Sequence, residues 1–377
     1  MPARPTVVAL VVTVLVGVAI SSVSADDRGH PATQAAMDMA VEQDGVPGVL
    51  GRAQDESGGW TGASGVADRR TERPRASRDR FRIGSLTKPF VAVVLLQLEA
   101  EHRIRLDDPV ERWLPGEVRG RGNDGRRITV RQLLGHTSGV FDYTLDPGIQ
   151  RAYTGTAFMS HRFSPHSPGG LVRTALGHPP DFAPGRGWHY SNTNYVLAGM
   201  IIQRVTGRPY GEEIERRVVR PLRLRDTSLP GRSPRIPRPS GRAYSTLFGT
   251  GGNKKNEKVY DVTAMNPSVA GASGEMVSST GDLVRFFRAL ARGRLLPERE
   301  FAQMRRTVPA EGGEGYGLGL SERKLPCGVT VLGHEGTILG SRSVAVTTPD
   351  GAHAAAFNVN GDWAGDTRTM VDAEFCG

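Results

Sequence analysis

The fold is decided by residues 79–98, which read DRFRIGSLTKPFVAVVLLQL. A turn at Gly84 leads into a run that is apolar nearly all round, as expected of a helix buried in the core. Ser85 and Lys88 stand where this helix begins. Residues three apart share a helix face, so we expect the Lys88 amine beside the Ser85 hydroxyl. A desolvated lysine loses its proton readily and can serve as a base, which makes the two a candidate nucleophile and base.

The first 25 residues have the pattern of an export signal. Arg4 precedes an apolar run from Val7 to Ile20, and small residues then lead to Ala25. An uncleaved anchor is the alternative, but the apolar run is short for a spanning helix. No later segment is apolar enough to cross a membrane. We therefore expect a secreted protein without a membrane span.

Length and charge limit the classes of protein to which this chain can belong. The chain has 377 residues, with 48 lysines and arginines against 39 acidic residues. This length suits one large domain or two interlocked ones. The basic residues are mostly single arginines without an aromatic-interleaved motif, so we expect no nucleic-acid partner. Attraction to an anionic cell envelope is a lesser alternative.

The two cysteines, Cys327 and Cys376, predict a disulfide in an exported chain. In the chain-entropy model such a bridge contributes roughly 4 kcal/mol. We expect no metal site and no cofactor, because the His334-Glu335 pair is not followed by histidine at 338 and the other histidines are scattered.

The remaining pattern predicts strand-forming ends around a helical middle. Strands are expected near residues 48–50, 60–67, 316–320, 329–332, 343–347 and 354–358. Helices are expected near 109–114, 128–134, 195–205, 281–292 and 366–375. Residues 144–188 are rich in Gly and Pro and predict long loops at a cleft rim, and residues 230–258 predict an exposed excursion.

Two further motifs join the serine and lysine. Tyr190-Ser191-Asn192 stands at the start of a second apolar helix, and His334-Glu335-Gly336-Thr337 follows a predicted strand. Each motif alone is weak evidence for a catalytic site. The tyrosine can be a packing residue, the asparagine a helix cap and the histidine a strand-end residue. Their order along the chain gives them more weight together.

In these motifs the chain resembles the penicillin-recognising serine hydrolases, specifically D-alanyl-D-alanine carboxypeptidases and class C-like β-lactamases. The resemblance covers most of the chain after residue 25 and extends to residues 79–85, 133–139, 191–195 and 316–320. It implies an α+β fold with a five-stranded antiparallel sheet flanked by helices, formed by residues 26–105 and 265–377. It also implies a mainly helical domain over 106–264, with the active site between the two.

The resemblance also implies an acyl-enzyme mechanism. Ser85 would attack a carbonyl, Lys88 and Tyr190 would share the proton, and Asn192 would bind the amide of the substrate. Tyr190 could act as a phenolate base only if cations such as Lys88 and His334 lowered its pKa.

The same resemblance gives the third motif its roles. His334 would carry a proton towards the leaving group and hold Tyr190 in place. The amides of Ser85 and Thr337 would stabilise the oxyanion. Gly336, without a Cβ, would let a substrate backbone lie against its strand.

Several positions depart from the carboxypeptidase pattern. Ser321 stands where an arginine grips the substrate's terminal carboxylate, and Arg323, two residues on, is the candidate substitute. Glu335 would repel a substrate carboxylate if it faced the cleft, and it would have no effect on substrate binding if it faced outward. Val269 stands where relatives often have tryptophan, which predicts a wider pocket.

We predict a secreted, monomeric D-Ala-D-Ala carboxypeptidase or transpeptidase acting on peptidoglycan stem peptides. A class C-like β-lactamase and an esterase or amidase of the same fold stay open, with a β-lactam or another acyl compound as substrate. A non-catalytic penicillin-binding protein is the alternative from a different class. A Ser-His-Asp hydrolase is disfavoured, because no Gly-x-Ser-x-Gly motif occurs.

Overall fold

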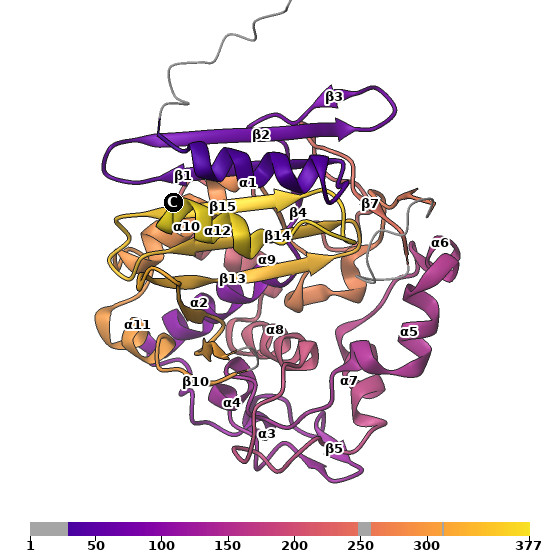
Figure 1. The fold of residues 1–377 in the computed structure, drawn as a ribbon. Coiled ribbons are helices and arrows are strands. Elements are labelled where there is room, and N and C mark those ends of the chain that lie inside the picture. Colours follow the sequence, from indigo (N-terminus) through magenta and orange to yellow (C-terminus); the bar gives the residue numbers. More distant parts are fainter. Residues whose placement is uncertain (1–28, 248–257, 311–312) are drawn as a thin grey trace, which may run out of the picture.

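The computed structural model describes residues 29–247, 258–310 and 313–377 (Figure 1). The expected export signal over 1–25 and part of the 230–258 excursion lie outside these residues. Within the described ranges, no helix is both long and apolar enough to cross a membrane. The structure holds a single chain, so the expected monomeric state stays a prediction.

An antiparallel sheet occupies the upper half of the molecule in Figure 1, above helices from the middle of the chain such as α4 (Val130–Leu134), α7 (Pro168–Leu176) and α8 (Asn192–Thr206). Within the described residues it has nine strands, in the order β10 (Val308–Pro309), β11 (Gly315–Tyr316), β12 (Ser321–Lys324), β13 (Thr330–Ile338), β14 (Ser341–Thr347), β15 (Ala354–Val359), β1 (Gly48–Gln54), β2 (Gly59–Asp68) and β3 (Arg73–Pro74). The five longest strands are neighbours, from β13 to β2. They include five of the six strands expected from the sequence pattern. The sheet has nine strands rather than the five implied by the resemblance, because short segments of two to four residues extend it on both sides.

The two ends of the chain meet in the middle of this sheet. β1 pairs with β15, with Val49 opposite Val359. Every residue of β15 is buried, as expected of a strand covered on both faces. Helices α1 (Pro31–Glu42) and α12 (Thr367–Cys376) pack together against one side of the sheet, and α10 (Thr280–Ala291) also packs against β1, β14 and β15.

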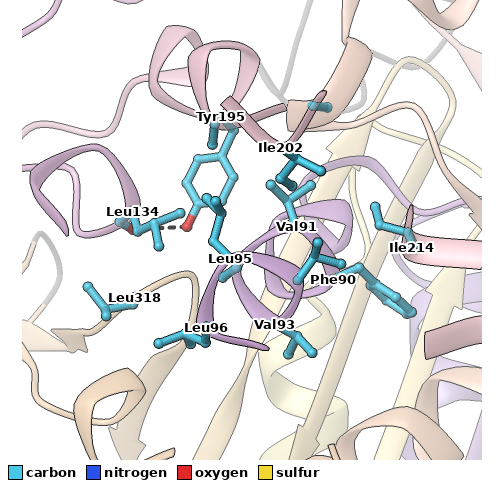
Figure 2. Packing of buried hydrophobic residues seen from close by; sticks show 14 of the residues in the cluster. Phe90, Val91, Val93, Leu95, Leu96, Leu134, Tyr195, Ile202, Ile214 and Leu318 are labelled. Carbon is cyan, nitrogen blue, oxygen red and sulfur yellow. Dashed lines mark hydrogen bonds between the residues drawn. The ribbon is translucent and has the colours of Figure 1, made fainter. Parts of the chain in front are cut away.

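The predicted buried helix is α2 (Thr87–Ala100), and its side chains are buried nearly all round. It packs against α8 (Asn192–Thr206), whose Tyr195 hydroxyl donates a hydrogen bond to the Leu134 carbonyl at 2.9 Å (Figure 2). One apolar cluster joins these helices to sheet residues such as Leu332 and Ala345. The sheet and the helical middle therefore share a core, and the predicted division into two domains stays a prediction.

The structure corrects the prediction of long loops over 144–188, because three short helices form there. They are α5 (Pro147–Tyr153), α6 (Phe158–His161) and α7 (Pro168–Leu176). Asp146 caps α5 by accepting from the amides of Gly148 and Ile149, and Ser167 caps α7 by accepting from that of Gly170. Each cap is followed by a proline at the first helical position, where its missing N–H costs nothing.

Other boundaries also differ from the prediction. The strand expected over 316–320 ends after Tyr316, because Gly319 adopts a φ of +71° in a turn. Helix α1 was not predicted. The remaining short elements are β4 (Phe81–Arg82), η2 (Gly84–Leu86), α3 (Val110–Trp113), β5 (Arg119–Gly120), β6 (Asn123–Asp124), α4 (Val130–Leu134), η3 (Tyr143–Leu145), η4 (Gly155–Ala157), α9 (Tyr210–Ile214), η5 (Glu215–Val219), β7 (Tyr244–Ser245), β8 (Tyr260–Asp261), η6 (Pro267–Val269), η7 (Gly271–Ser273), β9 (Val277–Ser278) and α11 (Glu298–Met304).

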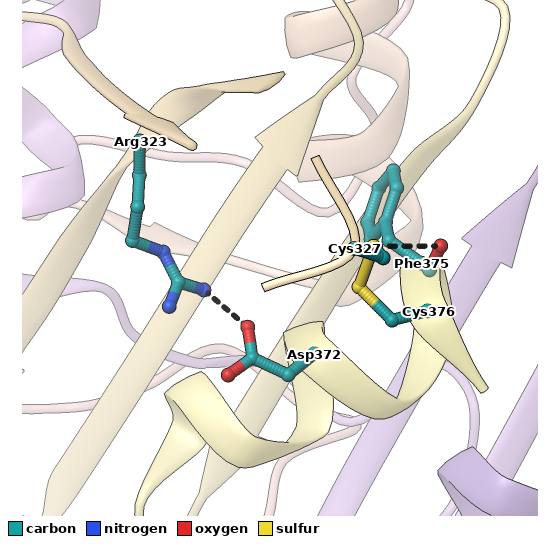
Figure 3. The surroundings of a disulfide bond; sticks show 5 residues. All are labelled: Arg323, Cys327, Asp372, Phe375 and Cys376. Carbon is teal, nitrogen blue, oxygen red and sulfur yellow. Dashed lines mark hydrogen bonds and ion pairs between the residues drawn. A yellow bond between two sulfur atoms is a disulfide. The ribbon is translucent and has the colours of Figure 1, made fainter. Parts of the chain in front are cut away.

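A disulfide joins Cys327 to Cys376, with the two Cα atoms 5.6 Å apart (Figure 3). It connects the turn after β12 to the end of α12. The last helix is thus tied covalently to the connection between β12 and β13.

A buried carboxylate holds α1 against α12. Glu374 accepts hydrogen bonds from the Thr33 hydroxyl at 2.8 Å, His30 Nδ1 at 2.9 Å and His353 Nε2 at 2.8 Å. Burial opposes its charge, but these three hydrogen bonds lower the pKa of Glu374 below its usual value.

Replacing this carboxylate should make the protein less stable in a pH-dependent way. We expect Glu374→Gln to lower the free energy of unfolding by about 1–3 kcal/mol at pH 7. Because the pKa is lower in the folded state, the carboxylate stabilises the fold above its unfolded pKa and loses this effect as pH falls through the folded pKa. Urea unfolding of parent and variant at pH 7 and below pH 4 checks this, and a gap that is equally large at both pH values would contradict it.

Candidate active site

Ser85 lies in η2, immediately before α2, and Lys88 lies in the first turn of that helix. Lys88 Nζ is 2.9 Å from Ser85 Oγ. The lysine is fully buried, and burial lowers its pKa to about 7, although the charge of Asp142 opposes this shift. A substantial fraction of Lys88 is therefore neutral at physiological pH.

The other contacts of Lys88 determine where its lone pair points. Its amine also lies 2.8 Å from Asn192 Oδ1 and 2.9 Å from the carbonyl oxygen of Ser273. Both oxygens can only accept. A neutral amine has two N–H groups, and it donates both to these oxygens. The lone pair then faces Ser85 Oγ, ready to accept the hydroxyl proton.

Asp142 is a site residue that the sequence analysis missed. Its carboxylate is buried and accepts from Asn192 Nδ2 at 2.8 Å and from the Thr144 amide at 3.0 Å. Because Nδ2 of Asn192 is held by Asp142, its Oδ1 faces Lys88. The available signal was an acidic residue inside the apolar stretch Val140–Tyr143, which needs a polar partner when buried.

Asp142→Asn should weaken catalysis and shift its pH dependence. The new amide can still cap η3 but no longer fixes the orientation of Asn192, so we expect kcat/KM to fall about 10- to 100-fold. Removing the negative charge also lowers the Lys88 pKa, so the acid limb of the kcat/KM profile should move to lower pH. A pH series of initial rates measures both effects.

Asp146→Asn is the matched control, because Asp146 also caps a short helix beside the cleft but does not contact Asn192. It should leave the acid limb in place. If the acid limb of the kcat/KM profile is unchanged in Asp142→Asn, then Asp142 serves only to cap η3.

Tyr190 lies over the same amine, with Lys88 Nζ 4.6 Å from its ring centroid. Burial, followed by the nearby Tyr316, raises the pKa of Tyr190 well above its usual value, although a hydrogen bond with the Ser85 side chain opposes the shift. The phenol is therefore protonated. The condition set above for a phenolate base, a pKa lowered by nearby cations, is therefore not met at this site.

His334 is also neutral, contrary to the idea that it supplies a cation. Burial and the nearby Lys88 lower its pKa to about 3. Its Nδ1 lies against the carbonyl of Glu335, and its Nε2 is 3.0 Å from the Tyr316 hydroxyl. The carbonyl can only accept, so Nδ1 carries the proton and Nε2 accepts from Tyr316.

Aromatic rings also pack against Tyr190. Tyr316 meets it edge to face with centroids 6.3 Å apart, and the His136 ring lies 4.3 Å away. The hydrogen bond of His334 goes to Tyr316 rather than to Tyr190. The His334 ring also lies 6.3 Å from the Tyr190 ring, so it can position Tyr190 both by direct packing and through Tyr316. Tyr316 and His136 lay in the quoted motifs, but nothing local assigned them this role.

Two glycines bring β13 against the nucleophile turn. A Cβ on Gly336 would lie 1.9 Å from the Ile83 carbonyl oxygen, and one on Gly84 would lie 2.7 Å from the Thr337 carbonyl oxygen. Gly336 is thus required by contact between two backbones of this chain, whereas we had expected it to make room for a substrate. The contact brings the backbone of Thr337 beside Ser85.

A cavity of about 290 Å³ opens beside Ser85. Asn192, Thr337 and Val269 line it together with the nucleophile. Further apolar or aromatic lining comes from Tyr143, Ile149, Tyr153, Met265, Ile338 and Leu339. None of the described residues in the lining carries a charge. The cavity suits an apolar side chain next to the carbonyl under attack.

The structure does not bring Arg323 into this cavity. Its guanidinium pairs with Asp372 of α12 at 3.1 Å (Figure 3). Glu335 also points outward and pairs with Arg368 at 2.6 Å. Arg323 is therefore not a substitute for the arginine missing at Ser321, and Glu335 does not repel a ligand in the cleft. Over the described ranges, no group of three or more His, Cys, Asp or Glu side chains is arranged to hold a metal ion.

A family model described as Beta-lactamase matches residues 33–373. The chain belongs to the beta-lactamase family. This confirms the predicted membership of the serine hydrolases that recognise penicillin, and it agrees with the antiparallel sheet flanked by helices.

Individual proteins to which the chain is similar are more informative about chemistry. A D-stereospecific amidohydrolase from Streptomyces sp. is 52% identical, with a TM-score of 0.87 over 92% of this chain and 99% of that chain. A D-amino acid amidase from Ochrobactrum anthropi SV3, solved with D-phenylalanine, is 29% identical, with a TM-score of 0.78 over 91% of this chain and 96% of its own. Esterase EstB from Burkholderia gladioli is 31% identical over 73% of this chain and 75% of its own. The chain is a serine hydrolase with the beta-lactamase fold.

Proposed function

We propose that the protein is an amidohydrolase that cleaves amides or esters of D-amino acids with apolar side chains. The observation that carries this proposal is the cavity beside Ser85, whose described lining is apolar or aromatic with a few polar groups and no charge. A side chain such as that of phenylalanine suits it. The likeness to a D-stereospecific amidohydrolase and a D-amino acid amidase supports the choice of bond and of stereochemistry.

Under this proposal Ser85 is the nucleophile and Lys88 the base. Ser85 Oγ attacks the carbonyl carbon and its proton moves to the lone pair of Lys88. The negative oxygen of the tetrahedral intermediate accepts hydrogen bonds from the amides of Ser85 and Thr337.

Tyr190 then completes the first half of the reaction. Its phenol stays protonated, so it passes a proton to the leaving amine or alcohol and receives one from the Lys88 side. The carbon–nitrogen or carbon–oxygen bond breaks and leaves an acyl group on Ser85. A water molecule then attacks the ester carbonyl and gives a proton to Lys88. Lys88 returns this proton to Ser85 Oγ as the acid is released.

The prediction of a D-Ala-D-Ala carboxypeptidase has less support than the amidohydrolase proposal. That activity requires a cation to bind a terminal carboxylate, and the candidate Arg323 is instead paired with Asp372. A β-lactam can still acylate Ser85, because attack on its ring uses the same nucleophile and base.

A substrate panel tests the proposal. We expect D-phenylalanine amide to be hydrolysed at least about tenfold faster, in kcat/KM, than its L-enantiomer, a difference of about 1.4 kcal/mol in transition-state binding. A D-Ala-D-Ala peptide and a chromogenic cephalosporin should be poorer substrates. Preferred release of terminal D-alanine would show that the protein is a carboxypeptidase instead. Rapid hydrolysis of the cephalosporin would show a β-lactamase, and an adduct without turnover would show a binding protein.

We also propose that the protein is exported, on the basis of the signal-like pattern in the first 25 residues. N-terminal sequencing of protein from the culture medium should begin near Asp26. Retention of the intact N-terminus in the cell fraction would contradict export.

A further inference from the structure

A second cavity, of about 610 Å³, is surrounded by arginines and shares no lining residue with the cavity beside Ser85. Its described lining holds two aspartates, Asp226 and Asp282. It holds eight arginines, which are Arg52, Arg78, Arg223, Arg225, Arg285, Arg288, Arg292 and Arg294. These residues come from β1, from the segments around 78 and 221–226, and from α10 with the turn that follows it.

The fold gathers these arginines by local geometry. Arg285, Arg288 and Arg292 follow one another at helical spacing along α10, so they share one face. In the segment after η5, Leu224 is buried, and Arg223 and Arg225 on either side of it are exposed.

The carboxylates nearby are already occupied. Asp226 pairs with Arg78 at 3.3 Å and with Arg80 at 2.7 Å. Asp282 accepts from the Asp226 amide and the Thr227 hydroxyl, and Arg285 lies 3.3 Å from it.

Several guanidiniums are left without a carboxylate. Within the described residues, no ion pair involves Arg223, Arg225, Arg292 or Arg294. Asp55 and Asp350 act on Arg288 and Arg292 only from beyond ion-pair distance. Burial, and then repulsion by Arg292, lowers the pKa of Arg288. The cavity therefore holds like charges at short range, an arrangement that a bound anion would stabilise.

We propose that this cavity binds a ligand with two or more closely spaced phosphate groups. Guanidinium groups bind phosphate oxygens in pairs, and several arginines around one small cavity match a compact chain of charges better than a single ion. None of the described lining residues is aromatic, so a nucleobase would have no ring to stack on. Free oligophosphate and the phosphodiester chain of an envelope polymer share this chemistry.

Calorimetric titration of the full-length protein tests the site. The probes are tripolyphosphate, orthophosphate, poly(glycerol phosphate) and, as a carboxylate polymer, polyglutamate. We expect tripolyphosphate to bind at least about tenfold more tightly than orthophosphate, and its affinity to fall as salt is raised. If poly(glycerol phosphate) binds more tightly per phosphate than tripolyphosphate, the ligand is the envelope polymer. If it binds more weakly, the ligand is a free oligophosphate.

The variant with Arg223→Gln, Arg292→Gln and Arg294→Gln should lose tripolyphosphate affinity about tenfold or more. Its amidase activity and thermal unfolding should match the parent. The control carries Arg119→Gln, Arg127→Gln and Arg173→Gln, which remove the same charge from exposed arginines outside the cavity. An equal loss in the control, equal binding of orthophosphate, equal binding of polyglutamate, or no binding heat would each overturn the proposal.

Discussion

Ser85→Ala is expected to abolish acyl-enzyme formation and to lower kcat/KM by about four orders of magnitude or more. The methyl group has no oxygen to attack the carbonyl. Lys88 keeps its bonds to Asn192 and Ser273, so the surroundings of the nucleophile should stay in place. Intact-protein mass spectrometry after mixing with a slowly hydrolysed ester or with penicillin should show an adduct on the parent and none on the variant.

The control for this experiment is Ser191→Ala. Ser191 is a buried serine of the second motif. Its hydroxyl has no hydrogen-bond partner within the described residues, and no lysine amine activates it. This variant should still form the adduct. An adduct that persists in Ser85→Ala, or that is lost only in Ser191→Ala, would mean that the nucleophile has been misassigned.

Lys88→Met is expected to lower kcat/KM by about three to five orders of magnitude, since it removes the base while keeping a side chain of similar length. The fold should tolerate it, because an apolar group avoids the cost of burying an amine. Thermal unfolding should therefore show little change or a small gain in stability. Lys324→Met, at an exposed position of β12, is the matched control and should keep full activity.

The pH dependence of kcat/KM is expected to identify Lys88 as the base. Burial lowers the Lys88 pKa to about 7, and only the neutral amine can accept the Ser85 proton. Below that pH, kcat/KM of the parent should fall about tenfold per pH unit. His334, with its pKa lowered to about 3, cannot produce a limb near neutrality, and the high pKa of Tyr190 excludes that group as well. The limb should vanish in Lys88→Met, and a limb that survives would assign the base to another residue.

Local features of the site could be predicted from the sequence. Ser85 and Lys88 lie three residues apart on one helix, so helix geometry alone places their side chains together. The long strands were located by short apolar runs, although the strand expected over 329–332 extends to Ile338 in the structure and contains His334 and Thr337. The prediction missed α5 and α7, where the caps at Asp146 and Ser167 outweigh the Gly and Pro content.

Properties that depend on burial could not be predicted in this way. The neutral state of His334 and the high pKa of Tyr190 arise from groups that pack around them from several elements. Asp142 acts through Asn192, a contact between residues 50 apart in the sequence. Arg323 was one of two residues on a plausible strand face, and only the position of α12 shows that it pairs with Asp372.

The backbone contact between Gly84 and β13 has a consequence for how the protein is made. The turn that carries the nucleophile is synthesised early, and the strand that supplies its partner amide is synthesised near the end, as is β15, which separates β14 from β1 in the sheet. A growing chain therefore holds Ser85 and Lys88 long before it can react. The active site is therefore completed only after β13 and β15 have been synthesised and have docked in the sheet.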